Sequence, residues 1–251
     1  MLKLNHLTGF GSGAAAAVVA DDVTSYVFDG TGDYLSIPDH ADWDFPQGDF
    51  TIECFIRIPV APPADDDFLY GQFVDTNNFI KLNYYDNGAV NFYIKEGGAS
   101  VVNVTSNLDL LTADTWMHIV VCRDGDNYYI YVDGTDQTAS GSPDSTTPSG
   151  IAGDVYIGAR DPTNAYKFIG YMDEFRISDT ARYPSGTGFT PTITQFTSDA
   201  NTLLLIHGGE AIASGTTGSG ATFVDSGNTG HTVTENGDAI RAAEFGKFST
   251  I

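Results

Sequence analysis

The sequence predicts an all-β protein: an antiparallel two-sheet sandwich of the jelly-roll kind. Short runs rich in Val, Ile, Phe and Tyr alternate in polarity along most of the chain. Clusters of Gly, Asp, Asn and Pro separate these runs, as turns separate antiparallel strands. Helical periodicity is almost absent, apart from one short turn expected at 41–45. Many short strands with frequent turns are typical of sandwiches and jelly rolls.

The expected strands begin at residue 25 and follow one another with few long gaps. Each is an alternating or apolar run bounded by turn residues. In chain order we expect strands near 25–29, 33–37, 50–58, 67–74, 78–85, 89–95, 100–105, 116–123, 127–133, 154–158, 167–178, 202–207 and 231–235.

Alternation within these runs assigns side chains to faces, because successive side chains of a strand point to opposite sides. In "FTIECFIRI" we expect one set to face the core and the other to face outward; the core set is Phe50, Ile52, Cys54 and Ile56, and the outward set is Thr51, Glu53, Phe55 and Arg57. In "NYYIYVDG" the core set is Tyr128, Ile130 and Val132, which sends Tyr129 and Tyr131 outward. In "NFYIK" Phe92 and Ile94 are expected inside and Tyr93 outside.

The charge of the chain is strongly negative. There are 33 acidic and 11 basic residues, which gives a formal net charge of −22. Such a balance repels nucleic acid and anionic membranes, so we expect neither as a partner. Many of the acidic residues lie in turn-like places, where they are either solvated or able to hold Ca²⁺.

The two cysteines and the apolar runs bear on the cell compartment. Cys54 and Cys122 each lie inside an expected strand, so we expect two buried, reduced thiols and folding in a reducing cytoplasm. No apolar run reaches the roughly 18 residues of a membrane-spanning helix. The stretch "AAAAVVADD" is similar to the end of a signal peptide, but it is short and only Lys3 precedes it as a positive charge, so we expect no processed signal.

Three strings carry a family resemblance. They are "FDGTGDYLSIPDHADWDFPQGDFTIECFIR" (28–57), "TWMHIVVCRDGDNYYIYVDG" (115–134) and "VYIGARDPTNAYKFIGYMDEFRISDTARY" (155–183). In this order they resemble the early strands, central hairpin and closing strands of the laminin-G-like, concanavalin A-like lectin/glucanase superfamily. The resemblance implies two antiparallel sheets in a jelly roll.

The C-terminal part of the chain holds what that family usually places first. The strand "TLLLIHG" and the string "DSGNTGHTVTENGDA" lie within 202–239, whereas the family's next strand begins at Ser25. Residues 201–251 either close onto the chain's own first strands, as in a circular permutation, or pair with a neighbouring subunit. Both would cover an otherwise open sheet edge, and a remnant of a tandem repeat is the weaker third option. We therefore divide the chain into an arm, 1–24, and a lectin-like domain, 25–251.

Catalytic residues are not evident. Relatives that hydrolyse glycans need two carboxylates flanking the bond, about 5–10 Å apart. The strand motif E-x-D-x-x-E is absent: Glu53 and Glu96 stand alone, and Asp173 and Glu174 are adjacent and expected on opposite faces of their strand. We expect no enzyme, and hydrolysis is the least favoured alternative.

Binding residues are suggested by the resemblance. Lectin-like relatives stack sugars on aromatic side chains of one sheet face or hold them through Ca²⁺. The candidate glycan-binding residues are Tyr93, Tyr129, Tyr131 and Phe55, which could instead simply fill a sheet face or meet another subunit. For a structural Ca²⁺ the matching positions are Asp29 and Asp173, and no other cofactor is expected.

The N-terminal string "MLKLNHLTGFGSGAAA" resembles the starts of bacteriophage particle proteins that carry this domain. We therefore expect a non-enzymatic virion structural protein that decorates the capsid or lies on the tail. Its expected partners are further copies of itself, with strand exchange as one way of association, other virion proteins such as the major capsid protein, and host surface glycans. The alternative is a free carbohydrate-binding lectin module.

Overall fold

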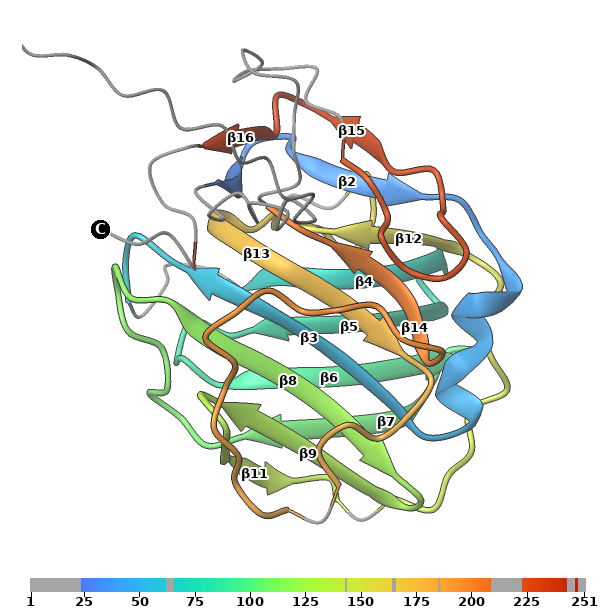
Figure 1. Cartoon of the computed structure of the whole chain (residues 1–251). Coiled ribbons are helices and arrows are strands. Elements are labelled where there is room, and N and C mark those ends of the chain that lie inside the picture. Colours follow the sequence, from blue (N-terminus) through green and yellow to red (C-terminus); the bar gives the residue numbers. More distant parts are fainter. Residues whose placement is uncertain are drawn as a thin grey trace, which may run out of the picture.

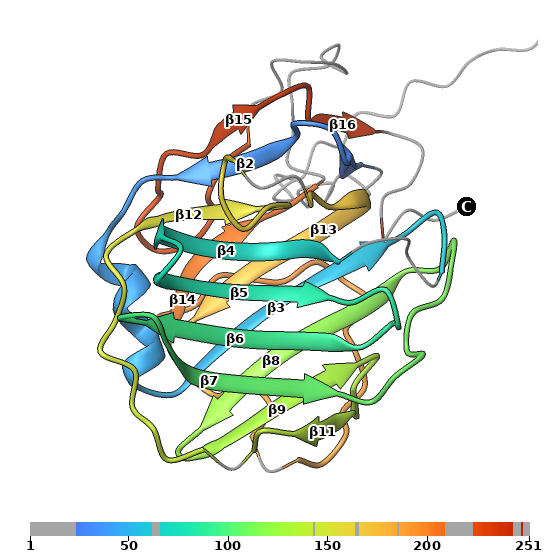
Figure 2. The same ribbon diagram turned by 180° about the vertical axis from the view of Figure 1, so that it is seen from behind.

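The structure is a computed structural model that describes residues 24–61, 66–142, 144–163, 166–184, 186–208, 223–242 and 247. Two antiparallel sheets pack face to face across one core (Figures 1 and 2). The predicted two-sheet, all-β sandwich is confirmed. The N-terminal arm predicted at 1–24 lies outside the described residues except for Thr24.

The first sheet, here sheet A, has the strand order β10-β9-β8-β3-β13-β1-β16, and β14 pairs with β13 beside this path. Its strands are β1 (Ser25–Asp29), β3 (Phe50–Arg57), β8 (Met117–Asp124), β9 (Asn127–Val132), β10 (Thr135–Asp136), β13 (Ile169–Ser178), β14 (Thr202–Ile206) and β16 (Ile240–Ala242).

The second sheet, sheet B, has the order β11-β7-β6-β5-β4-β12-β2-β15. Its strands are β2 (Tyr34–Ile37), β4 (Asp67–Asp75), β5 (Asn78–Tyr84), β6 (Val90–Glu96), β7 (Ala99–Ser106), β11 (Thr138–Ser140), β12 (Asp154–Ile157) and β15 (Thr234–Asn236). The turn expected at 41–45 is part of a 3-10 helix, η1 (Ala41–Gln47). Among the described residues, no helix combines the length and the apolar character that crossing a membrane requires.

Each expected strand range overlaps an observed strand, whereas β10, β11 and β16 were not expected. These three strands are only two or three residues long. A run that short holds too few residues to show alternation, so pairing with a neighbour decides whether it becomes a strand.

The core lies between the sheets, and the predicted inward faces supply it. The core cluster contains all of the residues assigned inward from the three strings: Phe50, Ile52, Cys54, Ile56, Phe92, Ile94, Tyr128, Ile130 and Val132. Aromatic rings tie the two sheets together, since Phe50 of sheet A lies 5.4 Å from Phe92 of sheet B between ring centroids. Both cysteines are buried free thiols, as predicted.

The outer face of sheet A is covered, which the alternation pattern did not predict. After β13 the chain turns back across this face before it enters β14 (Figure 1). Phe55 packs there against Phe196 and Leu205, and Tyr131 packs beside Phe189. The prediction that Phe55 and Tyr131 face outward is correct for the sheet, but both are buried, with 1% and 0% of their surface exposed.

The C-terminal strands pair within the same chain. β14 pairs with β13, β15 with β2, and β16 with β1, all antiparallel. A further bridge joins Ile206 to Asp225. The strands of the C-terminal segment thus complete both sheets in this single chain (Figure 1).

Candidate functional site

The four aromatic residues predicted to bind glycans do not form one surface. Phe55, Tyr129 and Tyr131 belong to β3 and β9 of sheet A, whereas Tyr93 belongs to β6 of sheet B. The sequence could not assign these residues to different sheets, because the pattern of a single strand does not show which sheet the strand joins. Tyr93 and Tyr129 are half-buried, but only Tyr93 lies on a sheet face that no described segment covers over β5–β7 (Figure 2).

Tyr93 is part of a larger surface on the outside of sheet B, here called the aromatic–basic face. Its members come from four neighbouring segments whose paired residues share one side of the sheet. Phe73 pairs with Phe79 and Phe79 with Lys95, while Lys81 pairs with Tyr93. The face consists of the half-buried Phe73, Lys81, Tyr93, Lys95 and Arg160, which lie over the buried rings of Phe68 and Phe79.

Cations lie over the rings of this face. The Lys81 ammonium is 5.6 Å from the centroids of both Phe68 and Tyr93, and the Arg160 guanidinium is 5.1 Å from that of Phe79. These distances suit attraction between a cation and the negative face of a ring. Burial lowers the pKa of Lys81 to about 8, and the nearby Arg160 charge adds to this, although Asp66 opposes it.

Arg160 reaches the face because the connection after β12 crosses β4 at Gly71. A Cβ atom on Gly71 would overlap the carbonyl oxygen and Cα of Arg160. The absence of a side chain at Gly71 therefore lets two backbones touch and sets the guanidinium over the rings of Phe73 and Phe79.

Polar groups flank the Tyr93 ring on both neighbouring strands. Lys81 of β5 pairs with Tyr93 on one side, and the exposed Asn103 of β7 pairs with it on the other. An ammonium and an amide beside a half-buried ring supply donors and an acceptor next to an apolar surface. The sequence analysis missed Phe79 and Lys81, although the alternation in "NFIKLNY" places both on one side of β5. No sequence pattern indicated Arg160, since its position depends on a tertiary contact.

Sheet A carries a buried charged group beneath its cover. The carboxylate of Glu53 is fully buried and accepts hydrogen bonds at both oxygens. Arg176 donates to Oε1 at 2.9 and 2.6 Å, and Tyr183 donates to Oε2 at 2.9 Å. His118 Nε2 lies 3.0 Å from Oε2. Both carboxylate oxygens of Glu53 are thus engaged by neighbouring side chains.

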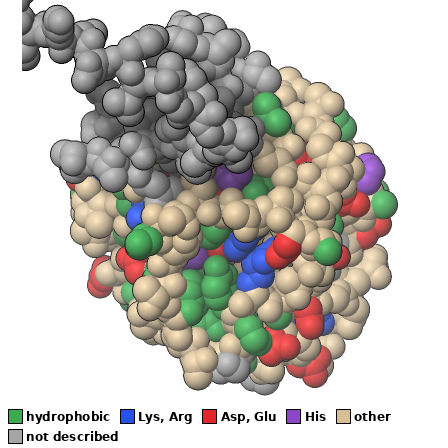
Figure 3. Space-filling model, viewed as in Figure 1, with side chains coloured by type: hydrophobic (Ala, Val, Ile, Leu, Met, Phe, Trp, Pro, Cys, Tyr) green, Lys and Arg blue, Asp and Glu red, His purple; other side chains and the backbone are tan. Residues whose placement is uncertain are grey.

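Around this group the surface of sheet A is partly apolar. Figure 3, viewed from the sheet A side, shows hydrophobic side chains gathered there with Lys or Arg beside them. Half-buried aromatic residues of this region include Trp116, Tyr129, Tyr183 and Phe189. Several of these rings already contact other aromatic rings. The ring centroids of Tyr183 and Phe189 stack 3.8 Å apart, and those of Tyr129 and Tyr131 are 6.0 Å apart.

A profile of the concanavalin A-like lectin/glucanases superfamily matches residues 29–185, more than half of the chain. The chain belongs to this superfamily. No curated protein sequence matches it closely enough to count as a relative. The family predicted from the three strings is therefore confirmed.

Several solved structures are similar to this chain. A candidate carbohydrate-binding protein from Bacteroides ovatus ATCC 8483 aligns with a TM-score of 0.55 and 18% identity, over 86% of this chain and 59% of that one. Domains LG4-5 of the mouse laminin alpha1 chain align with 0.48 and 16%, over 67% and 47%. Domain 4 of an extracellular arabinanase from Geobacillus stearothermophilus, solved with arabinotriose, aligns with 0.45 and 17%, over 64% and 73%. The chain thus spans less than two thirds of the length of the first two.

One expectation about carboxylates in this lectin-like domain is wrong. Asp173 and Glu174 were expected on opposite faces of their strand, but both contact the chain 196–208. Glu174 accepts a hydrogen bond from the backbone N of Phe196 at 2.6 Å, and Asp173 accepts one from Gly208 at 2.8 Å. The reason is a β-bulge between Asp173 and Arg176, where Glu174 has a φ of 52°, which interrupts the alternation.

The predicted calcium ligands also do not meet. Asp29 pairs with Ile169, which precedes Asp173 by four residues on β13. At roughly 3.3 Å per residue, Asp173 therefore lies about 13 Å along β13 from the partner of Asp29. Asp29 lies instead with Asp33 and Asp238, with carboxylate oxygens within 4.8 Å of one another. Burial raises the pKa of Asp33, and the charge of Asp29 adds to this. Asp29 and Asp173 therefore cannot share one ion in this structure.

A second group of metal-ligating side chains involves residues that the sequence analysis regarded as scattered. His40, Asp42 and His231 place their ligand atoms within 4.8 Å of one another. They come from the two ends of the described chain, so no spacing in the sequence could have revealed them.

Proposed function

We propose that this protein is a non-enzymatic lectin-like module that binds glycans on the aromatic–basic face of sheet B. The observation that carries the proposal is the half-buried ring of Tyr93 between Lys81 and Asn103 on an open sheet face. A sugar presents an apolar ring face that stacks on an aromatic side chain and hydroxyl groups that bond to ammonium and amide groups. Membership of the lectin/glucanase superfamily supports this, as does the name of the similar Bacteroides ovatus protein.

Sheet B suits this role better than sheet A. The chain after β13 covers much of the outer face of sheet A, and the aromatic residues Tyr183 and Phe189 there stack on each other. On sheet B the face over β5–β7 is open in the described part of the chain (Figure 2). An open sheet face encloses little of a sugar. We therefore expect a dissociation constant in the millimolar range, which corresponds to a binding free energy of about −4 kcal/mol.

The absence of catalysis is part of the same proposal. A glycan hydrolase needs one carboxyl group free to donate a proton and a second free to attack or activate water. Glu53 and Glu174 are fully buried, and both bind neighbouring groups. We expect no turnover of β-glucans.

The test of the binding site is a pair of matched tyrosine substitutions. Glycans that bind are first identified on an array. In calorimetry, Tyr93→Ala should then weaken their binding by at least about tenfold, because losing a stacking contact removes roughly 1.4 kcal/mol of binding free energy. Tyr129→Ala removes the same side chain from sheet A and should leave affinity unchanged. The proposed site is wrong if the two effects are reversed, and the proposed function is wrong if the intact protein binds no glycan.

The setting that we propose is the surface of a bacteriophage particle, on the capsid or the tail, facing host glycans. This rests on the sequence: the N-terminal string, the missing active-site motif and the net charge of −22. Further copies of the chain and other virion proteins would be its partners. The test is whether the protein remains with purified particles, and at how many copies; a glycan-binding protein absent from particles would be a free lectin module.

Attachment through the arm gives a second test of this setting. A chain that starts at Ser25 should fold and bind glycans as the full chain does, because the described strands begin there. It should fail to attach to particles if residues 1–24 anchor it. Normal attachment would show that docking runs through the domain.

A further inference from the structure

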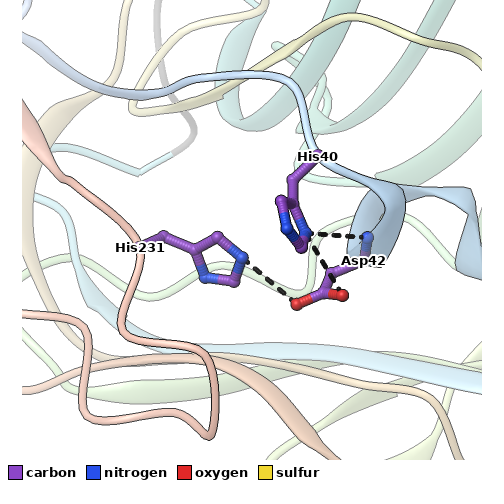
Figure 4. A group of neighbouring side chains, drawn as sticks. All are labelled: His40, Asp42 and His231. Carbon is purple, nitrogen blue, oxygen red and sulfur yellow. Dashed lines mark hydrogen bonds and ion pairs between the residues drawn. The ribbon is translucent and has the colours of Figure 1, made fainter.

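Three metal-ligating side chains meet where the helix η1 approaches the loop before β15 (Figure 4). His40 Nδ1 lies 3.2 Å from Asp42 Oδ1, and His231 Nε2 lies 3.2 Å from Asp42 Oδ2. The two imidazole rings pack edge to face with centroids 4.9 Å apart. Asp42 thus lies between the two imidazoles, and its backbone N–H also donates to His40 Nδ1 at 3.2 Å, so that nitrogen presents its lone pair to Asp42.

His231 is held in a fixed orientation. Its Nδ1 lies 2.8 Å from Oδ2 of Asp225, whose side chain is fully buried, and Trp43 packs on its ring at 4.5 Å. A carboxylate only accepts hydrogen bonds, so Nδ1 of His231 carries a hydrogen and donates it. The side chain of His231 is 6% exposed. This arrangement fixes Nε2 toward Asp42.

Nε2 of His231 is the unusual atom. It is buried and has no hydrogen-bond partner among the described residues. When Nδ1 of a neutral imidazole carries the hydrogen, Nε2 presents a lone pair, and Asp42 Oδ2 presents another. That oxygen already accepts a hydrogen bond from Thr229 at 2.6 Å. Two acceptors 3.2 Å apart repel each other unless a cation or a proton lies between them.

The spacing suits a transition metal ion. Zn²⁺ binds nitrogen and oxygen at about 2.0–2.1 Å in tetrahedral geometry, which places neighbouring ligand atoms roughly 3.3 Å apart. His40 Nδ1 lies 3.2 Å from Oδ1 of Asp42 and His231 Nε2 lies 3.2 Å from Oδ2, so an ion that contacts both nitrogen atoms would face both oxygens of this carboxylate. Two imidazoles with one carboxylate favour Zn²⁺ and similar metals, whereas Ca²⁺ takes about six to eight oxygen ligands. A buried carboxylate on the far nitrogen, as Asp225 provides, is the usual support of a metal-bound histidine.

We propose that His40, Asp42 and His231 bind one divalent transition metal ion, with Zn²⁺ as the reference ion and Asp225 orienting His231. The side chain of His40 is 46% exposed, which leaves a coordination position facing solvent. The ion would join the loop that carries His231 to η1, and so fasten the C-terminal segment to the strands that it completes. This inference is independent of glycan binding.

The first experiment measures binding by the full chain, purified without a histidine tag, treated with EDTA and dialysed. Calorimetric titration with ZnCl₂ should give one site per chain, and CoCl₂ should give the visible absorption of a tetrahedral cobalt site. At a free Zn²⁺ concentration about 100-fold above the dissociation constant the melting temperature should rise by about 5 °C. CaCl₂ at the same concentration should not reproduce the rise.

Substitutions assign the site. His40→Gln and Asp42→Asn should each weaken Zn²⁺ binding by at least about 100-fold, and Asp225→Asn by about 10–100-fold through the orientation of His231. Because nearly half of the His40 side-chain surface is exposed, H40Q should fold normally. Asp238→Asn is the matched control: it removes a carboxylate from the other cluster and should leave Zn²⁺ affinity unchanged.

Two results would overturn the proposal. One is the absence of stoichiometric Zn²⁺ or Co²⁺ binding, which would mean that a proton separates His231 and Asp42. The other is binding that survives in both H40Q and D42N but falls in D238N, which would place the ion elsewhere on this acidic chain.

Discussion

Glu53 lies on the outer face of sheet A but is fully buried beneath the chain that covers this face. Burial by itself raises the pKa of this carboxyl group, but the contacts with His118 and Arg176 outweigh it, and its pKa lies below the ordinary value. The group is therefore ionised when folded. Removing one partner from such a buried pair leaves the other charge without compensation.

We predict that Glu53→Gln costs about 3–5 kcal/mol of unfolding free energy at pH 7, because Arg176 then lacks its carboxylate. The folded pKa of Glu53 is lower than the unfolded one, so its contribution is complete above about pH 5 and is lost as pH falls through the folded value. The variant should therefore lose less stability than the native chain between pH 5 and pH 3.

Urea unfolding at several pH values measures both effects. Asp126→Asn, which removes an exposed carboxylate, is the control and should change stability by no more than about 0.5 kcal/mol. An equal pH dependence in E53Q and the native chain would contradict the prediction.

Gly71 is the second residue whose identity a tertiary contact requires. An added Cβ would overlap the backbone of Arg160. We predict that Gly71→Ala destabilises the protein by about 1–3 kcal/mol in chemical denaturation and weakens glycan binding by moving Arg160 off the aromatic–basic face.

Gly48→Ala serves as the control for Gly71→Ala, because a Cβ there would meet nothing within 4 Å. Stability should barely change in G48A. Equal behaviour of the two variants would show that the contact of Gly71 with Arg160 is not tight in solution.

Among the elements, β13 organises sheet A. It pairs with β3 along one edge, and with β1 and then β14 along the other. Without β14 the half of β13 from Phe175 to Ser178 would present unpaired backbone groups beside apolar side chains. Natural sheets avoid such exposed edges because they template aggregation.

We predict that a chain ending at residue 199 aggregates and loses its cooperative melting transition, because it lacks β14, β15 and β16. Light scattering after size exclusion and thermal melting measure this. Leu204→Ala provides a comparison: Leu204 is fully buried, so the variant should lose about 2–5 kcal/mol while keeping its strand pairing and its solubility. A soluble 1–199 chain with the native melting temperature would show that the C-terminal segment is not needed.

At the scale of the whole molecule, charge is the dominant feature. With a net charge of −22, repulsion among carboxylates opposes the compact state, and salt screens that repulsion. We predict that raising NaCl from about 10 mM to about 500 mM raises the melting temperature by a few degrees, since the screening length falls from roughly 30 Å to below 8 Å.

KCl should give the same rise as NaCl, because screening does not depend on which monovalent cation is present. A lower melting temperature at high salt would mean that attractive pairs such as Arg182 and Asp199 outweigh the repulsion.

The sequence by itself determined the class of fold, the positions of the longer strands and the family, because alternation of side chains is a local property that each strand displays alone. It also determined which side chains of three strands face the core between the sheets. Only the tertiary structure decided which sheet each strand joins. It therefore placed Tyr93 on a different sheet from Tyr129 and divided the four predicted aromatic residues between two surfaces. It likewise decided the cover over Phe55, the place of Arg160 and the meeting of His40 with His231. Each of these depends on segments far apart in the chain, such as Asp42 and Thr229, which are 187 residues apart. No local pattern encodes such contacts, since packing of the whole sandwich brings them about.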